Sequence, residues 1–323
     1  MGEALTTPAP RLFADEKALY GLTYDALGPA LFRRALEAPF TTTLLDVRGG
    51  SMTPWRQSSE HLFTFTNPAV ISAEHSIRAI PKAGGAPSTY PADLWSSGPH
   101  DDLFDVDGQN IYFARELPFG SNDTPYVALP LDHSGPPRPL TAPDDPVTDP
   151  RYPYSAPLAA GDYVYAVGRA YPSNSQPDAL FRMRKDGAAP AELLFAEPSL
   201  PTRRLAMAGD VLIGGAGMYQ GQGECVDGYV DTQVWVSHPP YHQKTPLVTH
   251  GGHLGDLTSD GAYLYWADDC EGGVYRLSLQ GGEPLRMAAG PSRDPRVAIV
   301  GPYLYYSARH PATGLTTLYR VAR

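Results

Sequence analysis

Histidines next to carboxylates are the residues of this chain best suited to chemistry. His100 precedes two aspartates, and His253 follows His250 across a pair of glycines. Imidazole beside carboxylate is typical of general acid–base catalysis and of metal binding. The catalytic candidates are therefore His100 and His253, and the metal-ligand candidates are His250, His253, Asp268 and Asp269. A His-x-x-His pair in a glycine-rich loop is more often a loop cap, and no HExxH motif or further close-spaced ligand accompanies it.

A second group of candidates consists of charged residues that precede recurring strand segments in some repeats only. A scaffold role would place similar residues in every repeat, so this asymmetry indicates a binding site for a carboxylate or another small anion. The candidate ligand-binding residues are Arg11, Arg204, Asp256, Arg293 and Arg296. The alternative is that the arginines pair with Asp256 and Asp294 and fill the channel that they surround.

The two cysteines, Cys225 and Cys270, lie in loops that we expect to be neighbours. A disulfide between them would indicate an oxidising compartment, and two separate buried thiols are the alternative. The same loops are rich in Asp and Glu, which would suit a structural calcium ion or form a solvated acidic rim. No glycine loop for a nucleotide and no nucleophile elbow is present, so we expect no cofactor.

Composition narrows the class of protein. Hydrophobic residues make up 42% of the 323 residues and charged residues 19%, which is typical of a folded chain. The net charge of −10 disfavours binding to nucleic acid or to anionic lipid. No apolar run approaches the 18 or so residues that a membrane helix requires, so we expect no membrane insertion.

The candidate site residues lie in a sequence that repeats a pattern of short β-strands, and this repeat must position them. A short aromatic or aliphatic triplet, flanked by turn residues, recurs about every 40 to 50 residues, which is the spacing of four-stranded propeller blades. The triplets are residues 18–20, 61–63, 110–112, 163–165, 211–213, 263–265 and 303–305. The predicted fold is all-β, a single seven-bladed β-propeller of four-stranded blades. A helix over residues 17–40 is the alternative for the first repeat.

The predicted propeller is one domain over residues 1–323. Its blades are expected at approximately 10–46, 52–90, 101–141, 154–196, 203–249, 253–288 and 295–323. Because the last repeat ends without an outer strand, we expect residues 3–8 to supply it and close the ring. Third strands carry an arginine at one equivalent place, for which we expect a scaffold role that bridges neighbouring blades; these residues are Arg33, Arg182, Arg276 and Arg320.

Two segments carry a resemblance to known propellers. Residues 265–268, Tyr-Trp-Ala-Asp, resemble the repeat motif of YWTD-type propellers from lipoprotein-receptor ectodomains. Residues 82–87 resemble the strand-joining turn of secreted bacterial propellers related to them. The resemblance extends over the whole chain as a repeat pattern and implies a fold more than a chemistry. Together with the cysteine pair it leads us to expect an extracytoplasmic protein whose leader is absent from this chain.

The function predicted from these features is that of a non-catalytic, extracytoplasmic, monomeric propeller. It would bind a protein or a small anionic ligand through the loop face around its channel. The alternative is a propeller-type lyase or hydrolase acting on a small anionic or cyclic substrate in the central funnel, with His100 and His253 as acid–base groups. A purely structural repeat protein is a third possibility. An enzyme would require the candidate side chains to converge on one cavity, whereas a binding module requires only an exposed surface.

Overall fold

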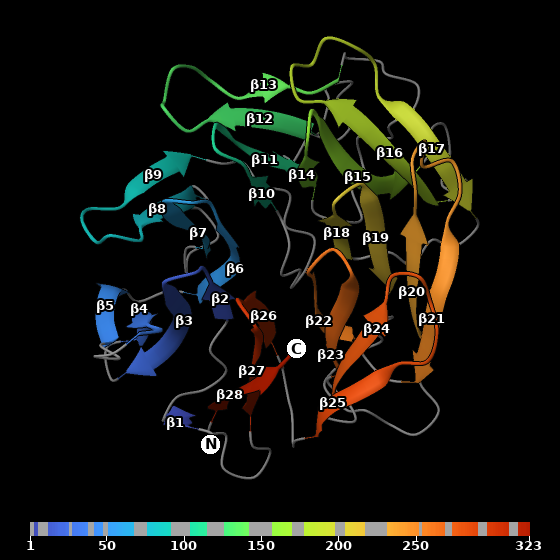
Figure 1. Ribbon diagram of the computed structural model, residues 1–323. Helices are drawn as coiled ribbons and strands as arrows, with labels where there is room; N and C mark the ends of the chain where they lie inside the picture. The colour runs from blue at the N-terminus through green and yellow to red at the C-terminus, as the bar shows by residue number, and fades with distance from the viewer. Residues whose placement is uncertain are drawn as a thin grey trace. The chain divides into compact units, whose positions relative to one another are not determined.

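The structure is a computed structural model of the 323-residue chain (Figure 1). It describes residues 3–5, 12–25, 28–37, 42–47, 51–67, 76–91, 104–114, 126–141, 157–169, 178–197, 204–216, 231–251, 254–268, 273–289, 296–309 and 316–323. Within these ranges every regular element is a strand, so the all-β prediction is confirmed. The helical alternative for residues 17–40 is wrong, because β3 (Ala18–Asp25) and β4 (Gly28–Ala35) pair there in antiparallel register. None of the described segments contains a helix that is long and apolar enough to cross a membrane.

The chain divides into two compact units, and each contains three complete four-stranded antiparallel sheets. The first unit contains residues 1–50, 215–236 and 245–323. Its sheets are formed by β2 (Leu12–Ala14), β3, β4 and β5 (Thr42–Val47); by β22 (Leu254–Ser259), β23 (Tyr263–Asp268), β24 (Gly273–Ser278) and β25 (Leu285–Ala289); and by β26 (Arg296–Val300), β27 (Tyr303–Arg309), β28 (Thr316–Ala322) and β1 (Glu3–Leu5).

The second unit contains residues 51–214 and 237–244. Its sheets are formed by β6 (Ser51–Gln57), β7 (His61–Asn67), β8 (Ser76–Pro81) and β9 (Ser88–Pro91); by β10 (Phe104–Val106), β11 (Asn110–Ala114), β12 (Tyr126–Pro130) and β13 (Arg138–Pro139); and by β14 (Leu158–Ala160), β15 (Tyr163–Arg169), β16 (Asp178–Arg184) and β17 (Glu192–Glu197).

The prediction of a single seven-bladed ring is wrong. Six blades lie whole within the two units, three in each. The remaining strands, in the order β18 (Arg204–Ala208), β19 (Val211–Ala216), β20 (Asp231–Ser237) and β21 (Thr245–Gly251), are divided, since the boundary between the units falls at Gly214 within β19. The sequence repeat failed here because periodicity counts hairpins, whereas contacts between sheets decide which of them pack into one compact body.

The N-terminus supplies an outer strand, as the sequence predicted. Strand β1 pairs antiparallel with β28, and Glu3 lies opposite Leu318. Residues 6–8 of the predicted strand lie outside the described residues. The pairing covers the edge of β28, which would otherwise be open to other chains.

Each sheet forms because short apolar runs end at residues that favour turns. In β23 every residue after Tyr263 is buried, and the strand follows Gly261, whose φ is +90°. Gly187, after β16, has a φ of +67°, and a Cβ there would meet the carbonyl oxygen of Pro139 at 2.8 Å. Glycine is therefore required at residue 187 by backbone conformation and by space together.

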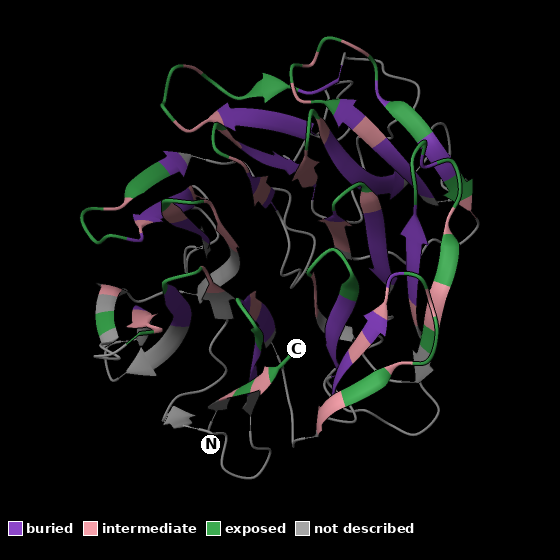
Figure 2. Cartoon of the chain, in the orientation of Figure 1, coloured by how far each residue is buried: buried purple, intermediate pink, exposed green. Residues whose placement is uncertain are grey.

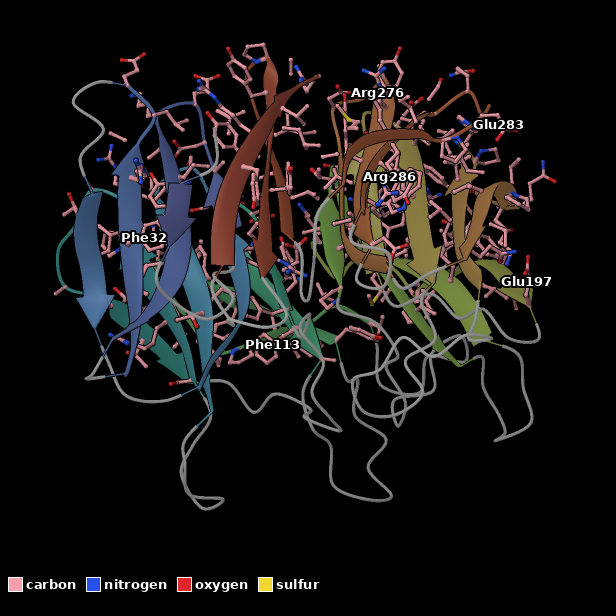
Figure 3. The ribbon with its side chains drawn as sticks, turned by 90° about the horizontal axis from the view of Figure 1, so that it is seen from below. Phe32, Phe113, Glu197, Arg276, Glu283 and Arg286 are labelled. Carbon is pink, nitrogen blue, oxygen red and sulfur yellow. The ribbon has the colours of Figure 1, made fainter. Side chains whose placement is uncertain are left out.

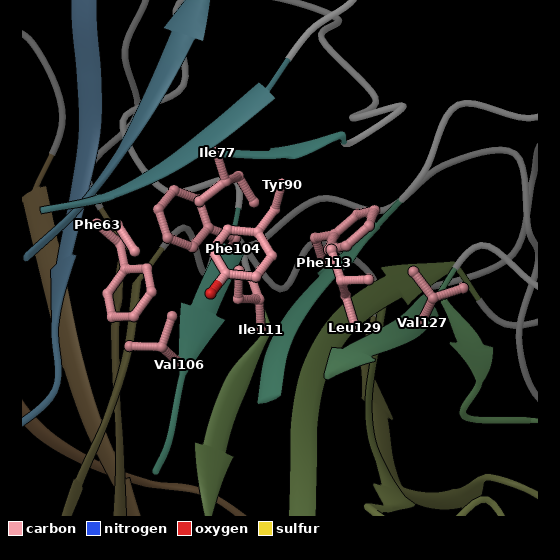
Figure 4. Close-up of a cluster of buried hydrophobic side chains, with 10 residues drawn as sticks. Phe63, Ile77, Tyr90, Phe104, Val106, Ile111, Phe113, Val127 and Leu129 are labelled. Atoms are coloured by element: carbon pink, nitrogen blue, oxygen red, sulfur yellow. The ribbon is translucent and has the colours of Figure 1, made fainter. Parts of the chain in front are cut away.

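The cores lie between consecutive sheets of each unit, and Figure 2 shows the buried residues along the strands. In the second unit, Phe63 and Ile77 of sheet β6–β9 pack with Phe104 and Phe113 of sheet β10–β13 (Figure 4). In the first unit, Tyr265 of sheet β22–β25 packs with residues of sheet β26–β28 that include Leu304 and Tyr306. Aromatic side chains from paired strands therefore fix the spacing between blades.

Candidate binding surface

Most of the candidate residues from the sequence lie outside the part of the chain that the structure describes. These are Arg11, His100, Cys225, His253, Asp269, Cys270 and Arg293. The disulfide, the acid–base histidines and most of the anion site therefore stay predictions. The site built below comes from described hairpin turns, such as residues 107–109 and 260–262, and from the strands that they join.

Five further candidates fall on strands. The backbones of Arg204 and Arg296 begin β18 and β26, Asp256 lies in β22, and His250 lies in β21. Asp268 ends β23, opposite Leu254, and is fully buried. The metal prediction stays open, and within the described ranges no group of three or more His, Cys, Asp or Glu residues is placed to hold a metal ion.

An aspartate at the hairpin turn organises one end of three sheets. Asp107 accepts hydrogen bonds from the backbone N–H groups of Gln109 and Asn110, and its second oxygen accepts one from the Tyr112 hydroxyl at 2.7 Å. Asp15 and Asp260 make the same three contacts, each with the tyrosine five residues later. The carboxylate caps the turn and satisfies the hydroxyl of a mostly buried tyrosine.

Two of these aspartates also bind a cation from the next sheet of the same unit. The Nζ atom of Lys185, after β16, lies 2.8 Å from Asp107, and the Nη1 atom of Arg323, after β28, lies 2.7 Å from Asp260. Burial opposes ionisation of Asp107, but Lys185, Tyr112 and two backbone N–H groups outweigh it and lower the pKa of the carboxyl group. The pKa of Asp260 is lowered in the same way. These contacts join neighbouring sheets in each unit.

The pKa values of the tyrosines are raised, in contrast to those of the aspartates. Burial, followed by the hydrogen bond to Asp260, raises the pKa of Tyr265 to about 12. Burial and Asp15 raise the pKa of Tyr20 to about 12 as well. A phenol that donates to a carboxylate loses this bond when it ionises, so these tyrosines stay protonated well above their usual range.

The repeated arginines pair with tyrosines of their own sheets. The register places each arginine opposite the last tyrosine of a triplet, in the pairs Tyr20–Arg33, Tyr165–Arg182, Tyr265–Arg276 and Tyr305–Arg320. In the last three pairs the guanidinium also stacks on the tyrosine two residues earlier. The Cζ atoms of Arg182, Arg276 and Arg320 lie 4.5, 4.7 and 4.9 Å from the ring centroids of Tyr163, Tyr263 and Tyr303. These cation–π contacts lie within a blade, and the expected bridge between blades stays a prediction.

These pairs lie next to the large exposed apolar side chains of the described surface. Four such residues are exposed by about a third or more, namely Leu193, Tyr263, Leu285 and Tyr303. Tyr263 and Leu285 belong to sheet β22–β25, on which Figure 3 labels Arg276, Glu283 and Arg286. Tyr303 belongs to the next sheet along the chain. In the first unit, one sheet therefore exposes a tyrosine and a leucine, and the next sheet exposes a tyrosine.

The sequence predicted hairpin turns at Asp107 and Asp260 but missed the contact of these aspartates with the following tyrosine, and it missed the exposed tyrosine–arginine pairs. The signal for the first was present, because an aspartate precedes a tyrosine by five residues at positions 15, 107 and 260. The signal for the second was incomplete, because the sequence does not show which outer-strand residue lies opposite each arginine. That information comes from strand register.

Comparison with known proteins places the fold. No family model matches the chain, and no curated protein matches its sequence. The β-propeller domain of Cps50 (Swd1) from Myceliophteria thermophila matches over 100% of both chains, with a TM-score of 0.65 and 12% identity. The β-propeller domain of the Trilobed protease from Pyrococcus furiosus matches over 99% of this chain and 95% of its own, with a TM-score of 0.61 and 10% identity. Puromycin hydrolase matches over 94% of this chain and 50% of its own, with a TM-score of 0.61 and 15% identity. The chain has a β-propeller fold.

Proposed function

We propose that this propeller is a non-catalytic module that binds a protein partner, in an extracytoplasmic location. The observation that carries the proposal is the exposed pairing of Tyr263 with Arg276 and of Tyr303 with Arg320 on consecutive sheets. Tyrosine and arginine are enriched at protein interfaces and dominate their binding energy. Stacking holds each guanidinium in place, so less conformational entropy is lost when a partner binds.

The predicted loop-face site belongs to the same proposal. Arg204 and Arg296 each begin the first strand of their sheet, where the sequence analysis expects a site for a protein or small anion. At each of these arginines an anionic group of a ligand would form a charge-assisted hydrogen bond. The repeats of YWTD type, the disulfide between Cys225 and Cys270 and the lack of a cofactor remain parts of the proposal.

Affinity capture with matched variants tests the proposed function. Tagged wild-type protein, the double variant Tyr263→Ser/Tyr303→Ser and the control Tyr163→Ser would each be incubated with an extract of the native host. The expected result is a partner that the wild type and the control retain and the double variant loses. Calorimetry with the purified partner should then show saturable binding. If the wild type binds no protein saturably, the proposed function is wrong.

A further inference from the structure

Two sheets place different residues opposite equivalent arginines of their third strands. In sheet β14–β17 the register sets Glu192 of the outer strand opposite Arg182, and their side chains form an ion pair of 2.8 Å. In sheet β22–β25 the register sets Leu285 opposite Arg276. Both sheets have a tyrosine opposite the arginine and a second tyrosine stacked on it. The two sheets therefore differ in the outer-strand residue that faces the arginine.

As a consequence, Arg276 has no carboxylate partner among the described residues. Arg276 stacks on Tyr263 at 4.7 Å, and nowhere in the described ranges does a carboxylate lie within ion-pair distance of it. Glu283 is exposed on the turn before β25, and no ion pair joins it to Arg276. Asp260 is engaged by Arg323 and by the Tyr265 hydroxyl. The nearby acids of this sheet therefore leave Arg276 available.

The surroundings of Arg276 add apolar area at the same point. Leu285 is 52% exposed and Tyr263 is 38% exposed, whereas Arg276 itself is half-buried. Strand β25 is also the edge strand of its sheet, and among the described segments no other strand pairs with it. Stacking covers a face of the guanidinium, whereas its N–H groups lie in the plane and can still bind a carboxylate. A partly desolvated arginine binds a carboxylate more strongly than a fully hydrated arginine does.

We infer that Tyr263, Arg276 and Leu285 form the recognition site for an acidic segment of a partner protein. One carboxylate of the segment takes the place that Glu192 holds beside Arg182, and an apolar side chain next to it covers Leu285. This inference rests on the proposed function and specifies its partner by chemistry. Charge complementarity selects the acidic segment, because Arg276 is the group that the sheet itself leaves unneutralised.

Peptide binding tests the inference directly. The probe is a fluorescein-labelled peptide of alternating glutamate and leucine, and its control replaces every glutamate by glutamine. The wild type should bind the glutamate peptide about tenfold more tightly than the glutamine peptide, since a charge-assisted hydrogen bond is worth about 1.5 kcal/mol or more. Equal binding of the two peptides, or no binding of the glutamate peptide at millimolar concentration, would overturn the inference.

Variants in both sheets sharpen the test. Arg276→Gln and Leu285→Glu should each weaken binding of the glutamate peptide about tenfold, the second because it places a carboxylate of the chain itself beside Arg276. Arg182→Gln should leave binding unchanged, since Glu192 already occupies that arginine. Glu192→Leu should create a second site of the same kind and double the stoichiometry, which no loss of folding could imitate.

The outcomes separate the inference from the function on which it rests. If a captured partner binds Leu285→Glu as tightly as it binds the wild type, the acidic-segment inference is wrong and the binding function stands. If neither a partner nor the peptide binds the wild type, both are wrong. Binding that depends on Leu285 but tolerates Arg276→Gln overturns recognition of a carboxylate in favour of apolar docking.

Discussion

Sheets β14–β17 and β22–β25 share one plan and differ in where each keeps its carboxylate. Both set a tyrosine opposite an arginine, Tyr165 with Arg182 and Tyr265 with Arg276. In the first sheet the acid is Glu192 on the outer strand, and Ala160 stands where an aspartate would cap the turn. In the second sheet the acid is Asp260 at the turn.

The difference shows how two sheets built from one repeat come to present different surfaces. The tyrosine–arginine pair remains in both sheets because the register and the core require large side chains there. The position of the carboxylate differs between the sheets, since a carboxylate at either position satisfies one polar group of the pair. With the carboxylate at the turn, Asp260 binds the Tyr265 hydroxyl and Arg276 has no carboxylate opposite it. The same repeat therefore pairs its own charges in one sheet and forms the proposed binding surface in the other.

The largest expected effect is a loss of unfolding free energy from core substitutions, which tests whether the cores of the two sheets contribute equally to stability. Trp266 and Phe181 are each about 1% exposed; Trp266 stacks on Tyr275, and Phe181 meets Tyr126 edge to face. Trp266→Ala and Phe181→Ala should each lower the free energy of unfolding by about 3 to 5 kcal/mol, because each leaves a cavity. Urea denaturation followed by circular dichroism measures this. Leu193→Ala, at an exposed position, is the control, and a loss at only one core site would show that the sheets are not equivalent.

The turn carboxylate should matter less than the cores. Asp260→Ala removes two backbone caps, the acceptor of the Tyr265 hydroxyl and the partner of Arg323, and should cost about 2 kcal/mol in unfolding free energy. Asp162→Ala is the matched control, since Asp162 is exposed at the turn of sheet β14–β17, and it should change stability by less than about 0.5 kcal/mol. Similar losses in the two variants would contradict the role given to Asp260.

Alkaline pH provides a further way to separate the two sheets. The pKa of Tyr265 is about 12 in the folded chain, against 10.0 for an unperturbed tyrosine, so its contribution to stability is complete below pH 10 and is lost between pH 10 and 12. Phenolate absorbance during a pH titration follows this ionisation. Asp260→Asn should move the ionisation of Tyr265 to lower pH, because the negative charge beside the phenol is removed. An unchanged titration would show that burial alone holds the proton.

The smallest effect belongs to the exposed ion pair. Glu192→Gln removes the partner of Arg182, but the Glu192 side chain is 46% exposed, so the loss should be about 0 to 1 kcal/mol. High salt should reduce the stability of the wild type more than that of the variant, as measured by thermal melts. A cost above about 2 kcal/mol would mean that Glu192 is a structural requirement, and the contrast with Leu285 would then lose its functional meaning.

Much of the architecture follows from local sequence. Aromatic triplets bounded by Gly and Asp predicted β11, β15, β23 and β27 close to their observed positions, because side-chain alternation and turn chemistry act over a few residues. The same holds for the arginines of the third strands, whose common place in the repeat foretold a common register. Their stacking on tyrosines of the same sheet was missed because that contact is diagonal across two strands.

The sequence by itself determined the strands, their order within each repeat and the supply of an outer strand by Glu3–Leu5. Tertiary structure decided which sheets pack together as one unit, that Asp107 and Asp260 bind Lys185 and Arg323 of the next sheet, and that Glu192 and Leu285 occupy matching places. The physical reason is range: hydrogen-bonded hairpins are specified by neighbouring residues, whereas the pairing of charges and rings across sheets depends on packing between segments tens of residues apart.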